Sequence, residues 1–217
     1  NTVMALATQG HWVPVSPTCP AECGITKRTH VRMMPPTGLN REHLKRALSA
    51  MDARGQAITC LARELGLRSK ETSLLDAKSA LNEAVKTGAV TIEHGTKGGR
   101  SRSFSVCSEW QLMALQRAAD VQGSARAVMP AEEDWKSWRE TGLRCIREIL
   151  QGFGIRGIHE LRSAYACDRY EQLTGHRAPV LGGNAPRALD QMARQQISAE
   201  LGHSRITITN AYLGGQR

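Results

Sequence analysis

The sequence lacks long apolar runs and the common motifs of nucleotide and zinc chemistry. Its longest uninterrupted apolar stretch, residues 3–7, is far shorter than the roughly 20 residues of a membrane-spanning helix. No signal-peptide pattern is found. Walker-type phosphate loops, strand-anchored GxGxxG, HExxH and GxSxG are all absent, which excludes ATP, nicotinamide and zinc-protease mechanisms. We therefore expect a soluble, cytoplasmic protein that needs no cofactor and no membrane.

Cysteine is sparse and irregularly spaced. Six cysteines in 217 residues follow no disulfide framework, so reduced thiols are expected. One close pair, Cys19 and Cys23, has His11 and His30 nearby, but zinc ligands need tighter paired spacing. We therefore predict a loop with two thiols there rather than a metal site.

Basic residues outnumber acidic ones. The chain has 29 Lys and Arg against 20 Asp and Glu, a net charge of +9 and a pI near 9.6. This excess favours a polyanionic partner. The 41% of hydrophobic residues is enough to build a core, which excludes disorder throughout.

Proline marks the first part of the chain as irregular. Residues 1–38 contain five of the eight prolines and no periodic pattern, so we predict an arm or linker there and a folded domain over residues 39–217.

Helical periodicity dominates that domain, and the fold class is predicted to be mainly α with one small antiparallel β-hairpin (α+β). The hairpin alternates at 90–94 and 104–106 around a turn at 95–99. The predicted helices are one opened by Asn40 and closed by Gly55, one over 58–65 that ends at Gly66, those over 69–86, 108–121, 131–150, 157–174 and 188–201, and a short turn around Tyr212.

Several residues able to act on an anionic backbone fall at turns and helix ends. Such positions allow cations to converge on phosphate. They are Arg68 in GLRSKE (66–71), Lys97 at the hairpin tip, His159 and Arg162 in HELR (159–162), His203 in LGH (201–203), and Tyr212, nine residues after His203.

These segments, in this order and with this last spacing, resemble the tyrosine recombinases, the phage-type integrases. The resemblance covers the catalytic domain of that family. It implies that Tyr212 attacks a DNA phosphodiester to form a 3′-phosphotyrosyl bond, that Arg68 and Arg162 hold the phosphate oxygens, and that Lys97 protonates the leaving 5′ oxygen. It further implies proton transfer by His159, phosphate contact by His203 and bracing of the arginines by Glu71.

The residue types suit this chemistry. Guanidinium is always charged and binds two phosphate oxygens with a planar fork, and each such donor contributes about 3 kcal/mol in comparable transition states. Taken alone, each residue also has a structural interpretation: Arg68 as a helix-end cation and Lys97 as a solvated tip. Tyr165 and Tyr170 are the rival phenols, and Tyr165 is predicted to lie in the core. The other histidines are not expected at the site: His11, His30, His43, His94 and His176.

Two features depart from the family pattern. Forty residues separate Arg162 from His203, and the excess falls at about 175–187, which we interpret as an inserted loop. It either contacts DNA through Arg177 and Arg187 or is a surface excursion, and the second is favoured. Only residues 213–217 follow Tyr212, so the exchange of a C-terminal tail between subunits, typical of the family's tetramers, is not expected for this chain. In addition, no helical DNA clamp precedes the domain, so we expect a catalytic fragment of a longer integrase, with a naturally short relative as the alternative.

The predicted function is site-specific, metal- and ATP-independent DNA strand exchange by an integrase of a phage, genomic island or conjugative element. Double-stranded DNA is the expected partner, with assembly into a tetramer on DNA and a bacterial, nucleoid-associated location. Two alternatives are a type IB topoisomerase-like enzyme and a DNA-binding relative without catalysis, although every reactive position is filled.

Overall fold

The computed structural model describes the backbone of residues 7–8 and 11–12 and all of residues 29–215. The chain divides into two units, Asn1–His30 and Val31–Arg217. In the first unit, β1 (Ala7–Thr8) pairs antiparallel with β2 (His11–Trp12). The predicted thiol pair Cys19 and Cys23 lies outside the described residues.

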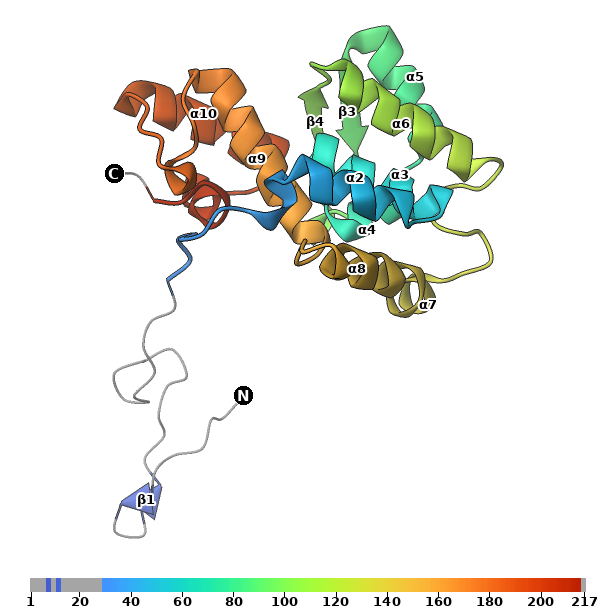
Figure 1. Ribbon diagram of the computed structural model, residues 1–217, viewed down its shortest axis with the longest axis horizontal. Coiled ribbons are helices and arrows are strands. Elements are labelled where there is room, and N and C mark those ends of the chain that lie inside the picture. Colours follow the sequence, from blue (N-terminus) through green and yellow to red (C-terminus); the bar gives the residue numbers. More distant parts are fainter. Residues whose placement is uncertain (1–6, 9–10, 13–28, 216–217) are drawn as a thin grey trace. The chain divides into compact units, whose positions relative to one another are not determined.

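The second unit is mainly helical with one two-stranded antiparallel sheet, as predicted (Figure 1). Its helices are α2 (Arg41–Ser49), α3 (Ala53–Glu64), α4 (Ser69–Leu74), α5 (Ala77–Thr87), α6 (Glu109–Gln122), α7 (Trp135–Glu140), α8 (Gly142–Gly152), α9 (Ile158–Thr174), α10 (Arg187–Glu200) and α11 (Asn210–Leu213). Short 3₁₀ helices are η1 (Thr37–Leu39), η2 (Lys97–Gly99), η3 (Pro179–Leu181) and η4 (Ile206–Thr209). The sheet is β3 (Ala89–Ile92) paired with β4 (Arg102–Ser105).

The hairpin has the predicted alternation. Val90 and Ile92 of β3 are buried, as is Phe104 of β4, and their neighbours along the strands are more exposed. In the register of the pair, Val90 lies opposite Phe104 and Ile92 opposite Arg102. One face of this small sheet therefore packs on the helices, since side chains alternate along a strand.

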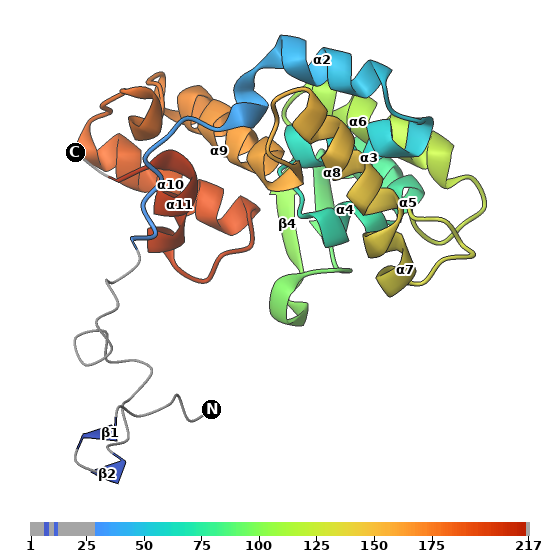
Figure 2. The same ribbon diagram turned by 60° about the horizontal axis from the view of Figure 1, so that its bottom comes forward.

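Two hydrophobic clusters form the core, and α9 belongs to both. The larger one joins α2, α3, α5, α6, α8 and the sheet to the first turn of α9. The smaller one joins the rest of α9 to α10 and α11. In Figure 2, α9 runs from the α10–α11 group towards α3 and α8. Because α9 carries HELR in its first turns, the candidate site lies where the two clusters meet.

Three predicted helices had wrong bounds, and an aspartate cap explains one boundary in each. Asp52 caps α3 by accepting the Gly55 N–H at 2.7 Å, so Gly55 lies in the first turn of a second helix instead of closing the first. The predicted helix 69–86 is two helices, because Asp76 caps α5. The predicted helix 131–150 begins only at Trp135, capped by Asp134, and it is interrupted at Thr141, whose ψ of −89° is not helical.

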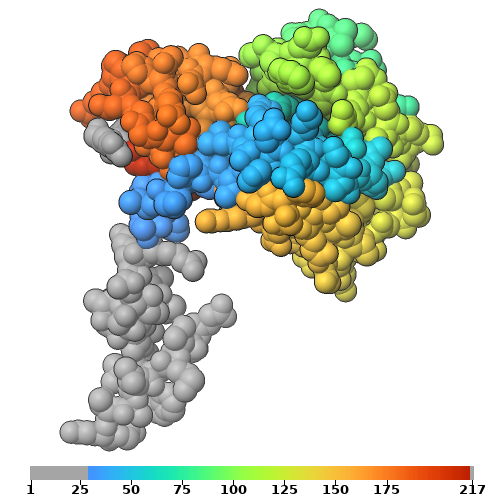
Figure 3. All heavy atoms as spheres, in the orientation of Figure 1, coloured from blue at the N-terminus to red at the C-terminus, as the bar shows by residue number. Residues whose placement is uncertain are grey.

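The folded unit includes the segment that leads into α2. Backbone N–H of Arg32 donates to Asn210 O at 2.9 Å, and the Arg32 guanidinium pairs with Glu160 at 2.6 Å. The space-filling view shows this blue segment against the orange surface of α9 and α10 (Figure 3). Residues from Val31 onward therefore pack with the domain that we predicted to begin at Leu39.

Residues 175–187 connect α9 to α10 and include η3. Ala178 and Pro179 are buried, whereas Arg177 and Arg187 are exposed. A Cβ at Gly214 would come within 3.0 Å of Val180 N, so this connection packs closely against the chain just after Tyr212. None of the helices in the described ranges combines the length and apolarity that crossing a bilayer requires.

Candidate active site

Four separate segments bring the candidate residues together. Arg68 immediately precedes α4, and Arg162 lies in the second turn of α9 with His159 one turn before it. His203 follows α10, and Tyr212 lies in α11. Residues three apart share a helix face, so HELR presents His159 and Arg162 to the same side.

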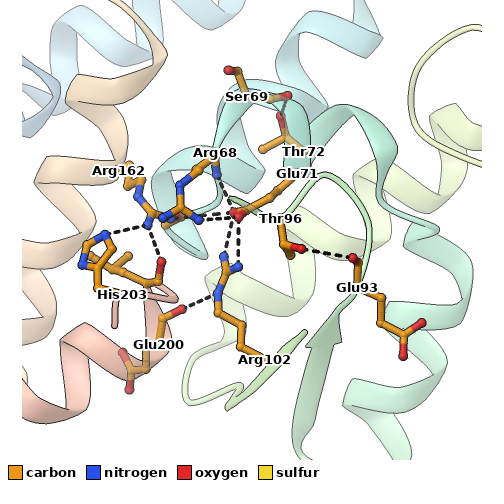
Figure 4. Close-up of polar contacts among 12 residues, drawn as sticks. Arg68, Ser69, Glu71, Thr72, Glu93, Thr96, Arg102, Arg162, Glu200 and His203 are labelled. Carbon is orange, nitrogen blue, oxygen red and sulfur yellow. Dashed lines mark hydrogen bonds and ion pairs between the residues drawn. The ribbon is translucent and has the colours of Figure 1, made fainter. Parts of the chain in front are cut away.

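Glu71 is the centre of an arginine cluster, which Figure 4 shows in detail. Its carboxylate is fully buried and pairs with Arg68 at 2.6 Å, with Arg102 at 2.7 Å, and more distantly with Arg162 at 3.8 Å. It also accepts the backbone N–H of Arg68 at 2.9 Å. The cluster of three guanidinium groups and one carboxylate carries a net charge of +2, so it attracts an anion.

The arginines determine the ionisation of Glu71. Burial alone would raise the pKa of the Glu71 carboxyl, but hydrogen bonds and charge from Arg102, the Arg68 N–H and the charge of Arg162 hold this pKa at about 2. The carboxylate is therefore ionised at neutral pH. This agrees with a bracing position and does not suit a proton donor.

Arg162 is buried and held on all sides. It donates through Nη1 to the Gly66 carbonyl and through Nη2 to Leu201 O at 2.5 Å. The fit at Gly66 is tight, because this residue has a φ of +64° and a Cβ there would lie 2.4 Å from the Tyr165 ring. These contacts tie the start of α4 and the end of α10 to α9.

Tyr212 is buried beside Arg162. Its phenolic oxygen lies 3.4 Å from Arg162 Nε, and its ring lies 5.7 Å below the Arg162 guanidinium. The rings of His159 and His203 lie 5.4 Å and 5.2 Å from the Tyr212 ring. The phenol is therefore on the same side as the arginines, surrounded by groups that can donate or accept protons.

Both histidines are biased towards the neutral form. Desolvation and the charges of Arg162, Arg68 and Arg102 lower the pKa of His203 to about 3. Desolvation and the nearby Arg162 also lower the pKa of His159, although part of this side chain remains exposed. Arg162 Nη2 lies 3.3 Å from His203 Nε2, so Nε2 is the acceptor and Nδ1 carries the proton. This Nδ1 is buried without a hydrogen-bond partner in the described part of the chain.

Lys97 is the predicted site residue that stays apart. It is exposed at the tip of the β3–β4 hairpin and forms no hydrogen bond or ion pair with the residues the structure describes. The glycines after it, Gly98 and Gly99, have positive φ and open space around them. The tip therefore offers little steric resistance to movement of Lys97.

The rival phenols are engaged elsewhere. Tyr165 is buried, as predicted, and donates to Glu200 at 3.0 Å, while Tyr170 donates to Asp190 at 2.8 Å. Burial and the facing carboxylates raise the pKa of both phenols. Neither is suited to become a nucleophile.

The sequence interpretation missed Arg102 and Arg194. Arg102 shares the inward face of β4 with Phe104, and a charged residue on the buried face of a strand is a signal that a buried partner exists. Arg194 is buried, pairs with Asp190 at 2.9 Å and donates to Asn210 Oδ1 and Gly214 O on either side of Tyr212. The position of Arg194 on α10 gave no comparable indication that its side chain would be buried.

Comparison with known proteins identifies the family and the fold of this chain. A solved structure described as XerA recombinase matches with a TM-score of 0.55 and 20% identity, over 88% of this chain and 62% of that chain. The present chain thus spans less than two thirds of that protein, and the match establishes a shared fold. No curated protein matches the sequence. A family model described as Integrase matches residues 28–168, more than half of the 217 residues. The chain therefore belongs to the integrase family and has the fold of a tyrosine recombinase catalytic domain.

Proposed function

We propose that this chain is the catalytic part of a site-specific DNA recombinase that cuts and rejoins DNA through a 3′-phosphotyrosyl intermediate. The observation that carries the proposal is the 3.4 Å distance between the Tyr212 phenol oxygen and Arg162 Nε, with the rings of His159 and His203 at 5.4 Å and 5.2 Å from the phenol ring. This proximity supports a reaction in which Tyr212 is the nucleophile, the arginines stabilise charge and the histidines transfer protons.

In the proposed cleavage step, the Tyr212 oxygen attacks phosphorus and the bond from phosphorus to the 5′ oxygen breaks. The phenol proton passes to neutral His159 or to water. Lys97 gives a proton to the departing 5′ oxygen, which leaves as a hydroxyl. The phosphorus remains bonded to the 3′ oxygen and to Tyr212.

Arg68 and Arg162 are proposed to hold the non-bridging oxygens. Arg68 keeps one guanidinium nitrogen on Glu71 at 2.6 Å and is 24% exposed, so the remaining N–H groups can reach an incoming phosphate. The unused Nδ1 donor of His203 would be satisfied by a phosphate oxygen. Glu71 keeps both arginines oriented and reduces their mutual repulsion.

Rejoining follows by the reverse reaction. The phosphotyrosyl bond conserves the energy of the broken phosphodiester, so a 5′ hydroxyl from another strand can attack it without ATP or metal. We propose double-stranded DNA attachment sites of a phage, genomic island or conjugative element as substrate, and a tetramer on DNA as the assembly that brings the strands together.

A nicked duplex that loses a short 5′ fragment on cleavage tests the proposal. The wild-type protein is expected to form an adduct with this DNA that survives denaturation, and Tyr212→Phe should form none. Tyr170→Phe is the matched control, since it also removes a buried phenol hydroxyl, and it should keep the adduct. An adduct that persists in Tyr212→Phe would refute the assignment.

Two further measurements test the partner and the reaction class. With several phosphate contacts, DNA affinity should fall steeply, by about 10³-fold, between about 50 and 200 mM salt, and salt-insensitive binding would contradict a DNA substrate. Relaxation of supercoiled plasmid without any recombinant product would favour the topoisomerase-like alternative over strand exchange.

A further inference from the structure

Arg102 joins the hairpin to two other segments of the site, as Figure 4 shows. Its Nη1 and Nη2 donate to the two oxygens of Glu71 at 2.9 Å and 2.7 Å. Its Nε donates to Glu200 O at 2.7 Å, at the end of α10. One side chain on β4 therefore fixes the strand to α4 and to the chain that leads into His203.

The surrounding glycines fit this contact. Gly202 has a φ of +65°, and a Cβ there would lie 2.9 Å from Arg102 Cδ. On the other side of the tip, a Cβ at Gly95 would lie 2.8 Å from the Lys70 carbonyl. The hairpin is thus anchored on both sides of Lys97, by the close approach of Gly95 and by the Arg102 bonds, while the tip stays exposed.

Resting on the function proposed above, we propose that Arg102 is a positioning residue that holds the β3–β4 hairpin so that Lys97 reaches the leaving 5′ oxygen. A general acid works only within hydrogen-bond reach of its target, and loss of orientation of about 1 Å slows a reaction strongly. An isolated two-stranded hairpin is marginally stable at best, so external anchors set where its tip lies.

Direct phosphate binding by Arg102 is the competing role. The side chain is 8% exposed, and three of its five N–H groups already point at Glu71 and Glu200. Arg68, at 24% exposed and with one guanidinium contact to Glu71, is far more accessible. The geometry therefore favours a role in which Arg102 affects the reaction by positioning Lys97 and does not bind the phosphate itself.

A substrate with sulfur in place of the bridging 5′ oxygen separates the two roles. A thiolate leaves without a proton because a thiol is far more acidic than an alcohol, so this substrate does not need the acid. The experiment measures adduct formation on matched oxygen and sulfur substrates by wild type, Lys97→Ala, Arg102→Met and Arg102→Lys. Arg100→Ala is the control, because it removes an equal charge from an exposed position on the same hairpin.

Lys97→Ala should lose about 100-fold or more on the oxygen substrate, the usual range for a general acid, and recover on the sulfur substrate. Arg102→Met should lose at least 10-fold on oxygen and recover on sulfur, and the double variant with Lys97→Ala should react no more slowly than Lys97→Ala alone. Arg102→Lys keeps the charge but loses the bidentate hydrogen bonds to Glu71. It should therefore show a smaller defect on the oxygen substrate and should also recover on the sulfur substrate. Arg100→Ala should leave the ratio of the two rates unchanged.

Equal defects of Arg102→Met on both substrates, in protein that melts as the wild type does, would overturn the inference and leave Arg102 as a phosphate ligand or structural residue. If Arg102→Met does not fold, the ratio of the rates of Arg102→Lys on the oxygen and sulfur substrates distinguishes the two roles. An absence of adduct with wild type on either substrate would instead count against the proposed function, which separates the two failures.

Discussion

Within a single chain, the phenolic oxygen of Tyr212 lies 3.4 Å from Nε of Arg162. Arg194 donates to Asn210 and Gly214 on either side of this tyrosine, and Cys167 Sγ lies 3.8 Å from Tyr212 O. The proposed nucleophile is therefore anchored next to Arg162 of its own chain, which favours cleavage in cis.

Mixing two inactive variants tests cleavage in cis. Tyr212→Phe lacks the proposed nucleophile, and Arg162→Ala lacks a proposed phosphate donor but keeps Tyr212. We expect a mixture of the two to form no more adduct than either variant alone, because no subunit then contains a complete site. Adduct formation by the mixture at near wild-type level would show that the tyrosine is delivered to a neighbouring subunit.

Replacement of Glu71 by Gln should destabilise the domain. The variant keeps the shape but leaves three guanidinium groups facing each other around an uncharged amide. Breaking a buried ion pair on one side costs about 3 kcal/mol or more. Urea unfolding measures this loss, and the exposed Glu132→Gln should change the free energy of unfolding by less than about 0.5 kcal/mol. A neutral effect of Glu71→Gln would contradict the bracing role.

The two shifted pKa values predict the response to acid. The pKa of Glu71 is about 2 in the folded chain against 4.5 ordinarily, so its stabilising contribution is present above pH 4.5 and is lost as pH falls towards 2. The pKa of His203 is about 3 against 6.5. Between the folded and the ordinary pKa of each group, the unfolded chain binds a proton that the folded chain does not bind. The free energy of unfolding therefore falls as pH decreases through each of these ranges.

For His203 the consequence is measurable by NMR. Its ring signals should stay those of the neutral form from pH 7 to pH 5 in the free protein. Bound DNA places a phosphate beside the ring and should raise this pKa. A free-state midpoint near pH 6.5 would contradict the desolvated, cationic surroundings described above.

Arg32 should contribute to stability although it precedes the predicted domain start. It donates to Glu160 at 2.6 Å and 2.7 Å, and both side chains are largely buried. Arg32→Ala should cost about 2 kcal/mol, as for hydrogen bonds to charged groups, whereas the exposed Arg126→Ala should cost little. Equal effects of Arg32→Ala and Arg126→Ala would place the start of the cooperative unit after Arg32.

The sequence predicted which helices and strands exist better than it predicted where each of them begins and ends. The predicted helices over 108–121, 157–174 and 188–201 correspond to α6, α9 and α10, and the predicted alternation corresponds to the hairpin. Helical periodicity is less reliable at boundaries. It failed where an aspartate cap divides a periodic stretch, as at Asp52, Asp76 and Asp134. Periodicity continues across such a cap when both helices pack on the same core, and the stop signal is then a single side chain.

The same limit applies to the site. Residues that match a family motif could be selected in advance. The structure brings Arg68, Glu71 and Arg162 into one cluster and places Arg162, His159 and His203 beside Tyr212. For Arg102 the sequence offers only the general signal of a charged residue on a buried strand face, and the spacing of the residues does not encode its contacts to Glu71 and Glu200 or those of Arg194 to Asn210 and Gly214. Lys97 was selected by its tip position, and the role proposed for it depends on how the hairpin is held.

The most direct test of the account is to locate the DNA on the protein. The adduct formed on the nicked duplex is digested with nuclease and protease, and mass spectrometry identifies the residue that carries the nucleotide remnant. We expect the remnant on Tyr212, joined through a 3′-phosphate. A remnant on Tyr165 or Tyr170, or a linkage through a 5′-phosphate, would contradict it.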